Sequence, residues 1–93
     1  MSLNYEWYEP KRLSNIEHHG LDFKSVTDFD WESALVYEDT PRDYGETRYI
    51  AYGKLSGRLT VMVFSLRNDT IRIISLRKAN NREVTRYETR IQN

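Results

Sequence analysis

Cationic side chains gather in the segment 71–87, where a strand is expected to end and the last helix to begin. Arg77 and Lys78 follow an isoleucine-rich run, and Arg82 and Arg86 come four residues apart on the helix. Such groups at a strand end can clamp a phosphate and stabilise negative charge that develops on it. They can also be solvated cations or partners for carboxylates. The segment therefore predicts a site for a polyanion or for an acidic protein partner.

Phosphate chemistry also needs a group that moves a proton, and His19, Glu83 and Tyr87 are the candidates near this charge. A cation at the end of a helix is favoured by about 0.3–1 kcal/mol, so a capping role for His19 competes with a general-base role. Tyr87 lies on an apolar stripe, which favours a core position over a catalytic one, and it is retained as a candidate RNA contact. RNA carries its own nucleophile in the 2′-hydroxyl, so cleavage requires no metal and no cofactor.

Other classes of site lack their signatures. The sequence has no glycine-rich phosphate loop, no dinucleotide fingerprint and no nucleophile elbow. It has no cysteine, and two adjacent histidines are too few for a histidine-rich metal site. Four further arginines, on expected strands or at their ends, would bind the nucleic-acid backbone and tune the salt dependence of the affinity: Arg48, Arg58, Arg67 and Arg72.

The net charge of zero hides a division of the chain into two halves. Residues 1–46 hold four cations and eleven carboxylates, and residues 47–93 hold ten cations and three carboxylates. This predicts two faces of opposite sign, unless the two halves pair with each other in the fold. The length favours one domain over 1–93. No apolar run approaches the roughly 20 residues of a membrane span, and no signal peptide is evident, so a cytoplasmic protein without membrane contact is expected.

The hydrophobic pattern predicts an α+β fold in the order β-α-α-β-β-β-β-α, with two N-terminal helices and one C-terminal helix. We expect an antiparallel sheet of four to five strands with the helices on one face. Gly20 should end the first helix, and Asn80 with Glu83 resembles a capping box for the last. The stripe Val84, Tyr87 and Ile91 should dock on the sheet. The expected elements are strands at 4–8, 34–37, 47–55, 58–66 and 70–76, and helices at 11–19, 23–29 and from 79 or 80 onward.

Several short motifs, in register over about residues 5 to 88, resemble the BrnT toxins of bacterial BrnT/BrnA toxin–antitoxin modules. The resemblance implies a RelE-like fold and a metal-independent ribonuclease toxin that a cognate BrnA-like antitoxin neutralises. It also implies that operator DNA is bound only through the antitoxin complex. The motifs are Glu6-Trp7, Pro10-Lys11 with Asn15, His19-Gly20, Asp22-Phe23, Gly45-Glu46-Thr47-Arg48, Tyr52-Gly53, Gly57-Arg58-Leu59, Ile71-Arg72-Ile73-Ile74-Ser75, Arg77-Lys78-Ala79, Arg82-Glu83 and Tyr87.

The chain departs from that pattern at two places. His18 stands where relatives usually have lysine, and Phe64-Ser65-Leu66-Arg67 replaces a His or Tyr followed by Thr-Glu-Arg. The second departure keeps an alternative open, in which a catalytically degenerate protein only binds antitoxin as a co-repressor or decoy. A stand-alone nucleic-acid-binding domain is a third interpretation.

Overall fold

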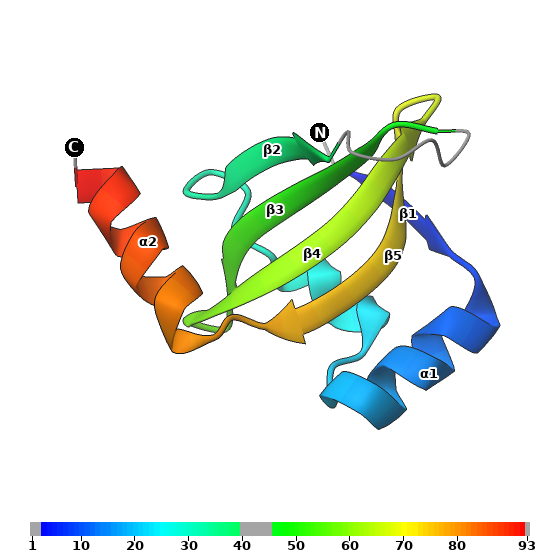
Figure 1. Cartoon of the computed structure of the whole chain (residues 1–93). Coiled ribbons are helices and arrows are strands. Elements are labelled where there is room, and N and C mark those ends of the chain that lie inside the picture. The colour runs from blue at the N-terminus through cyan, green and yellow to red at the C-terminus, as the bar shows by residue number, and fades with distance from the viewer. Residues whose placement is uncertain (1–2, 40–45, 93) are drawn as a thin grey trace.

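The computed structural model describes residues 3–39 and 46–92 and has the expected order of elements (Figure 1). The second helix is a short 3-10 helix instead of an α-helix, and no described helix is long and apolar enough to cross a membrane. The elements are β1 (Asn4–Trp7), α1 (Glu9–His19), η1 (Phe23–Asp28), β2 (Leu35–Asp39), β3 (Arg48–Leu55), β4 (Arg58–Arg67), β5 (Thr70–Lys78) and α2 (Asn81–Gln92).

The five strands form one sheet in the order β1-β5-β4-β3-β2. Strands β2 to β5 are the expected antiparallel meander, and both tight turns use residues with positive φ, at Ser56-Gly57 and Asn68-Asp69. The prediction of a wholly antiparallel sheet is wrong at one edge, because β1 pairs in parallel with β5. Strand direction at that edge depends on a pairing of residues far apart in the chain, which a four-residue apolar pattern does not encode.

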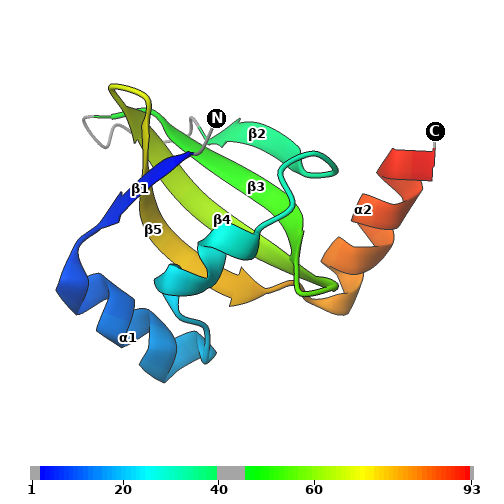
Figure 2. The same ribbon diagram turned by 180° about the vertical axis from the view of Figure 1, so that it is seen from behind.

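The main core lies between the sheet and the segment from α1 to η1 (Figure 2). Phe23, Val26 and Phe29 enter it from η1 and the residue that follows. They meet alternate residues of the central strands, including Met62 and Leu76, both of which are fully buried. This alternation fixes which side chains of each strand face the core and which face the opposite side.

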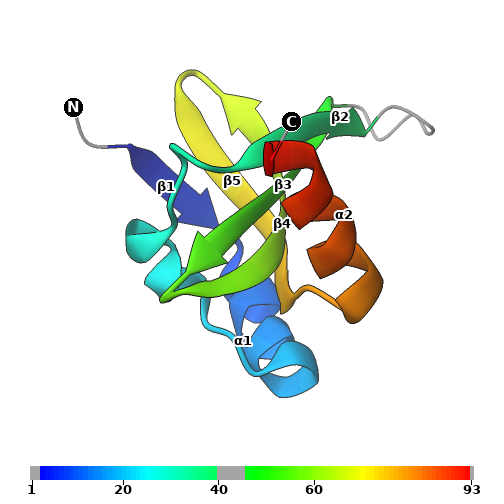
Figure 3. The ribbon, with the colours of Figure 1, turned by 90° about the vertical axis from the view of Figure 1, so that its left-hand side faces the viewer.

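Helix α2 lies against that opposite side of the sheet, so the expectation that all helices share one face is wrong (Figure 3). Tyr87 is 3% exposed, and its hydroxyl donates to the Ser33 carbonyl at 2.7 Å. Ile91 is 48% exposed, so the expected apolar stripe docks through Val84 and Tyr87 but not through its last residue. The attachment of α2 is therefore concentrated in its first half.

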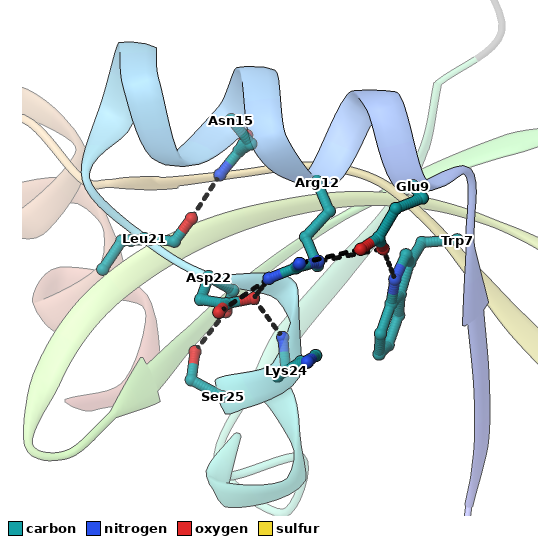
Figure 4. A network of polar contacts seen from close by, with 8 residues as sticks. All are labelled: Trp7, Glu9, Arg12, Asn15, Leu21, Asp22, Lys24 and Ser25. Atoms are coloured by element: carbon teal, nitrogen blue, oxygen red, sulfur yellow. Dashed lines mark hydrogen bonds and ion pairs between the residues drawn. The ribbon is translucent and has the colours of Figure 1, made fainter.

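Helix α1 is fastened at its start by an arginine between two carboxylates (Figure 4). Arg12 donates to Glu9 at 2.7 Å and 2.9 Å and to Asp22 at 3.0 Å and 3.2 Å. Hydrogen bonds from Arg12 and from the Trp7 indole lower the Glu9 pKa to about 2. Asp22 is the N-cap of η1 and also accepts from the Lys24 amide, so this cluster joins α1 to η1.

Helix α1 is also joined to the edge of the sheet by one buried amide. Strand β1 pairs with residues 70–73 of β5, and the rest of β5 extends beyond it. There Asn15 donates to the Leu76 carbonyl at 2.7 Å and accepts from the Leu76 amide at 3.1 Å. Its side chain thus takes the place of the next strand. It also donates to the Leu21 carbonyl, past the Gly20 cap that ends α1 as predicted.

Candidate nucleic-acid interface

The face of the sheet that α1 and η1 do not cover (Figure 1) carries rows of side chains that run across the strands, and two of these rows contain arginines. Residues paired in register share a face, so each row is fixed by the strand pairing. We call this surface the open face. The first of these two rows is Leu35, Tyr52, Val61 and Arg77, and the second is Asp39, Arg48, Ser65, Arg72 and Glu6. An uncharged row, Tyr37, Ile50, Val63 and Ser75, lies between them.

Arg77, at the end of the first row, is held by Glu83 of α2. The two guanidinium Nη atoms donate to the two carboxylate oxygens at 2.9 Å and 2.8 Å. Glu83 also accepts from the Asn80 amide at 2.9 Å, and the Asn80 side chain accepts from the Glu83 amide at 2.8 Å. The predicted capping box is thus confirmed, and it fixes the carboxylate that orients Arg77.

The same contacts determine the charge state of the pair. The Arg77 hydrogen bonds, followed by the one from the Asn80 amide, lower the Glu83 pKa to about 2, and Glu83 raises the pKa of Arg77. Glu83 is therefore ionised at neutral pH, with both oxygens occupied by donors. This arrangement makes it a positioning residue for Arg77 and a poor acceptor for a substrate proton.

Arg77 retains donors that its protein partners do not use. A guanidinium has five N–H groups. In the described residues Arg77 gives two to Glu83 and one, at 3.3 Å, to the Lys78 carbonyl. The Nε–H group and one Nη2–H group remain, and in a planar guanidinium these two point in parallel. They match two oxygens of a phosphate, and the Arg77 side chain is 37% exposed.

The second row adds positive charge nearer the β1 edge. Arg72 forms an ion pair with Glu6 at 3.3 Å, and Arg48 lies 3.9 Å from Glu46. Arg67 follows at the exposed end of β4, where alternation puts it on the same face. The open face thus gathers four arginines chosen from the sequence, at the partly exposed surface where a polyanion could lie.

A groove of about 390 Å³ separates α2 from β2 and β3 beside Arg77. We call it the α2 groove. The rings of Tyr37 and Tyr52 meet there edge to face, with centroids 5.9 Å apart. Glu83 lines the groove and also binds Arg77, so the groove adjoins the Arg77 site. The groove is lined by Leu35, Tyr37, Tyr52, Glu83, Arg86, Tyr87 and Arg90.

Other predicted site residues lie elsewhere. Lys78 pairs in register with buried Thr60, so it points to the side opposite Arg77. Arg58 pairs with core residue Leu55 at the β3–β4 turn. His19 ends α1 on the side of the sheet away from α2 (Figure 2).

On α2 the predicted residues divide between the groove and its surroundings. Arg86 lines the α2 groove, whereas Arg82 is exposed outside it. Tyr87 reaches the groove wall but is almost entirely buried. The structure therefore brings Arg77, Glu83 and Arg86 together, and it leaves His19 and Lys78 apart from them.

The departure at Phe64 falls on a packing position. Its ring stacks on Tyr49 with centroids 5.4 Å apart and meets Trp31 edge-on at 5.5 Å, on the core side of the sheet. Only 4% of Phe64 is exposed. The phenylalanine therefore removes no polar group from the open face.

Sequence reasoning missed the groove tyrosines as a pair. The sequence singles out Tyr52 only as part of the Tyr52-Gly53 motif, and Tyr37 is the last residue of the expected strand at 34–37. The signal that could have found them is the alternation of Arg48, Ile50 and Tyr52, which predicts a partly exposed second face on β3.

Comparison with known protein families gives a match. The family model described as the ribonuclease toxin BrnT of type II toxin–antitoxin systems matches residues 7–83. The matched range includes Arg77, Tyr52 and Glu83 and ends before Arg86 and Arg90. No curated protein matches the chain.

Proposed function

Because the chain belongs to the BrnT family of ribonuclease toxins of type II toxin–antitoxin systems, we propose that it is a metal-independent endoribonuclease whose phosphate-binding centre is Arg77. The observation that carries this proposal is the parallel pair of N–H groups that Arg77 has left after Glu83 fixes its orientation. Arg86 and the open-face arginines would hold the adjoining backbone.

The proposed reaction uses the substrate's own 2′-hydroxyl. The 2′-oxygen attacks phosphorus and loses its proton, while the bond from phosphorus to the 5′-oxygen breaks and that oxygen gains a proton. The products are a 2′,3′-cyclic phosphate and a 5′-hydroxyl. Arg77 donates to the non-bridging oxygens, where charge builds up in the transition state.

We assign the proton transfers to solvent. The Glu83 carboxylate, with a pKa of about 2 and both oxygens occupied, is a weak base. His19 lies at the end of α1 on the other side of the sheet, where a capping role suits it. Glu83 contributes by fixing Arg77, and Lys78 supplies general positive charge at the sheet edge.

The antitoxin partner would act on the same surface. We propose that a BrnA-like antitoxin covers the open face with acidic side chains and so excludes RNA. Operator DNA would then be bound by the antitoxin, because the toxin's arginines are occupied in the complex. Growth inhibition would follow from cleavage of cellular RNA by free toxin.

Purified protein incubated with RNA tests the proposal. We expect cleavage with and without EDTA, products that carry a 2′,3′-cyclic phosphate, and no cleavage where the 2′-hydroxyl is methylated. Added antitoxin should stop the reaction. RNA left intact by protein that binds its antitoxin tightly would contradict the proposal and support the decoy alternative.

A further inference from the structure

We infer that the α2 groove is a binding site for one unpaired base of single-stranded RNA, with the adjoining phosphate held by Arg86 and Arg90. The inference rests on the proposed function and adds a second contact to it: Arg77 binds the phosphate at one end of the groove, and the groove selects a nucleotide whose base is free. Duplex RNA could not make the contact with the groove, because its bases are paired.

The aromatic walls are suited to a base. Tyr37 and Tyr52 both line the groove, and their rings meet edge to face at an interplanar angle of 74°. Leu35 adds an apolar surface, and Tyr37 is 41% exposed. Proteins that bind single strands use exposed aromatic rings of this kind as stacking platforms. The volume of about 390 Å³ falls within the range of small-molecule sites.

The positive charge of the groove suits a ligand that carries a phosphate next to its base. Arg86 and Arg90, one helical turn apart on α2, line it, and Arg77 is joined to it through Glu83. The one carboxylate among the lining residues, Glu83, is already neutralised by Arg77. The arginines thus place positive charge beside two aromatic rings, which matches the alternation of base and phosphate in a single strand.

Binding to a strand that cannot be cleaved separates this site from catalysis. The probes are fully 2′-O-methylated oligonucleotides, each with 2-aminopurine at a different position. Matched oligonucleotides have an abasic site in place of the 2-aminopurine. We expect 2-aminopurine fluorescence to change on binding at one position. The abasic strand should bind about 5- to 150-fold more weakly to the unmodified protein.

Tyr37→Leu should lower affinity for the complete strand by a similar factor and remove the preference over the abasic strand. Tyr8→Leu, at an exposed tyrosine outside the groove, is the matched control and should change affinity less than twofold. Arg90→Ala should weaken both strands and reduce the slope of log affinity against log salt by about 0.7. Arg82→Ala, on the same helix outside the groove, should leave that slope nearly unchanged. Circular dichroism verifies that each variant is folded.

Equal affinity for complete and abasic strands, or Tyr37→Leu binding like the unmodified protein, would overturn the inference. So would a Tyr37→Leu variant that keeps RNA binding but loses antitoxin binding, because the groove would then be a protein-docking surface. None of these results bears on cleavage of unmodified RNA, which is measured separately. The proposed ribonuclease function therefore fails only if that RNA remains intact.

Discussion

Replacing Glu83 with glutamine removes the charge that orients Arg77 while retaining the shape of the side chain. The carboxylate accepts two hydrogen bonds from Arg77 and one from the Asn80 amide. The amide oxygen of glutamine can keep one Arg77 contact, but its NH₂ group faces the other guanidinium donor. The variant should therefore loosen both the start of α2 and the Arg77 side chain.

The lowered pKa of Glu83 gives the size and the pH dependence of the effect. The difference between the ordinary value of 4.5 and about 2 corresponds to an upper limit of about 3 kcal/mol. Arg77 is 37% exposed, so solvent screening reduces the expected loss to about 1–2 kcal/mol. Because the folded-state pKa is lower than the unfolded one, this stability is fully present above pH 4.5. It is lost as the pH falls through about 2.

Thermal unfolding of the unmodified protein, Glu83→Gln and Glu88→Gln between pH 2 and pH 7 tests this reasoning. Glu83→Gln should lower Tm by about 5–10 °C at pH 7, and the gap should shrink as the pH falls below 4.5. Glu88, exposed on the same helix, provides the control and should change stability by less than about 0.5 kcal/mol. A Tm for Glu83→Gln equal to that of the unmodified protein at pH 7 would refute the assigned role of the pair, as would a gap that persists unchanged at pH 2.

Three further substitutions test the packing that positions the site. Asn15→Ala should lower the free energy of unfolding by about 2–3 kcal/mol, because the amide and the carbonyl of Leu76 both lose their buried partner. The Leu76 amide should then exchange its hydrogen faster, and unchanged protection would contradict the edge contact. In Gly53→Ala the new methyl carbon would overlap the Phe29 ring, so the urea midpoint should fall by an amount equivalent to about 1–3 kcal/mol, with partial recovery on adding Phe29→Leu. Tyr87→Phe should cost about 1 kcal/mol in thermal unfolding by removing the hydroxyl contact to the loop before β2, and an unchanged Tm would contradict that contact.

Features encoded by neighbouring residues were predictable from the sequence. The glycine cap of α1, the Asn80–Glu83 capping box and the two hairpin turns depend on side chains or φ angles within a few positions. The arginines of the open face could also be identified from the sequence as candidate anion-binding residues, because strand alternation leaves them partly exposed. The resemblance to BrnT toxins predicted the family of the chain, and the family match confirms that prediction.

Features that depend on pairing between distant segments were not predictable. Tertiary packing determines the direction of β1 beside β5 and the side of the sheet that α2 covers. A short apolar stripe is compatible with either direction and either side. The Asn15 contact with Leu76 joins residues 61 positions apart, and a buried asparagine has no local signature. Adjacent Arg77 and Lys78 were treated as one clamp, although strand alternation sends them to opposite faces.

The rate of RNA cleavage by Arg77→Ala, compared with that of Lys11→Ala, tests the central claim most directly. Lys11 is an exposed cation on α1, so its loss controls for the change in net charge. Loss of Arg77 should reduce the cleavage rate about 100- to 1,000-fold in folded protein, whereas Lys11→Ala should cleave within about threefold of the unmodified rate. Arg86→Ala, which leaves the Arg77–Glu83 pair intact, should show an intermediate loss. Cleavage by folded Arg77→Ala at the unmodified rate would contradict the account.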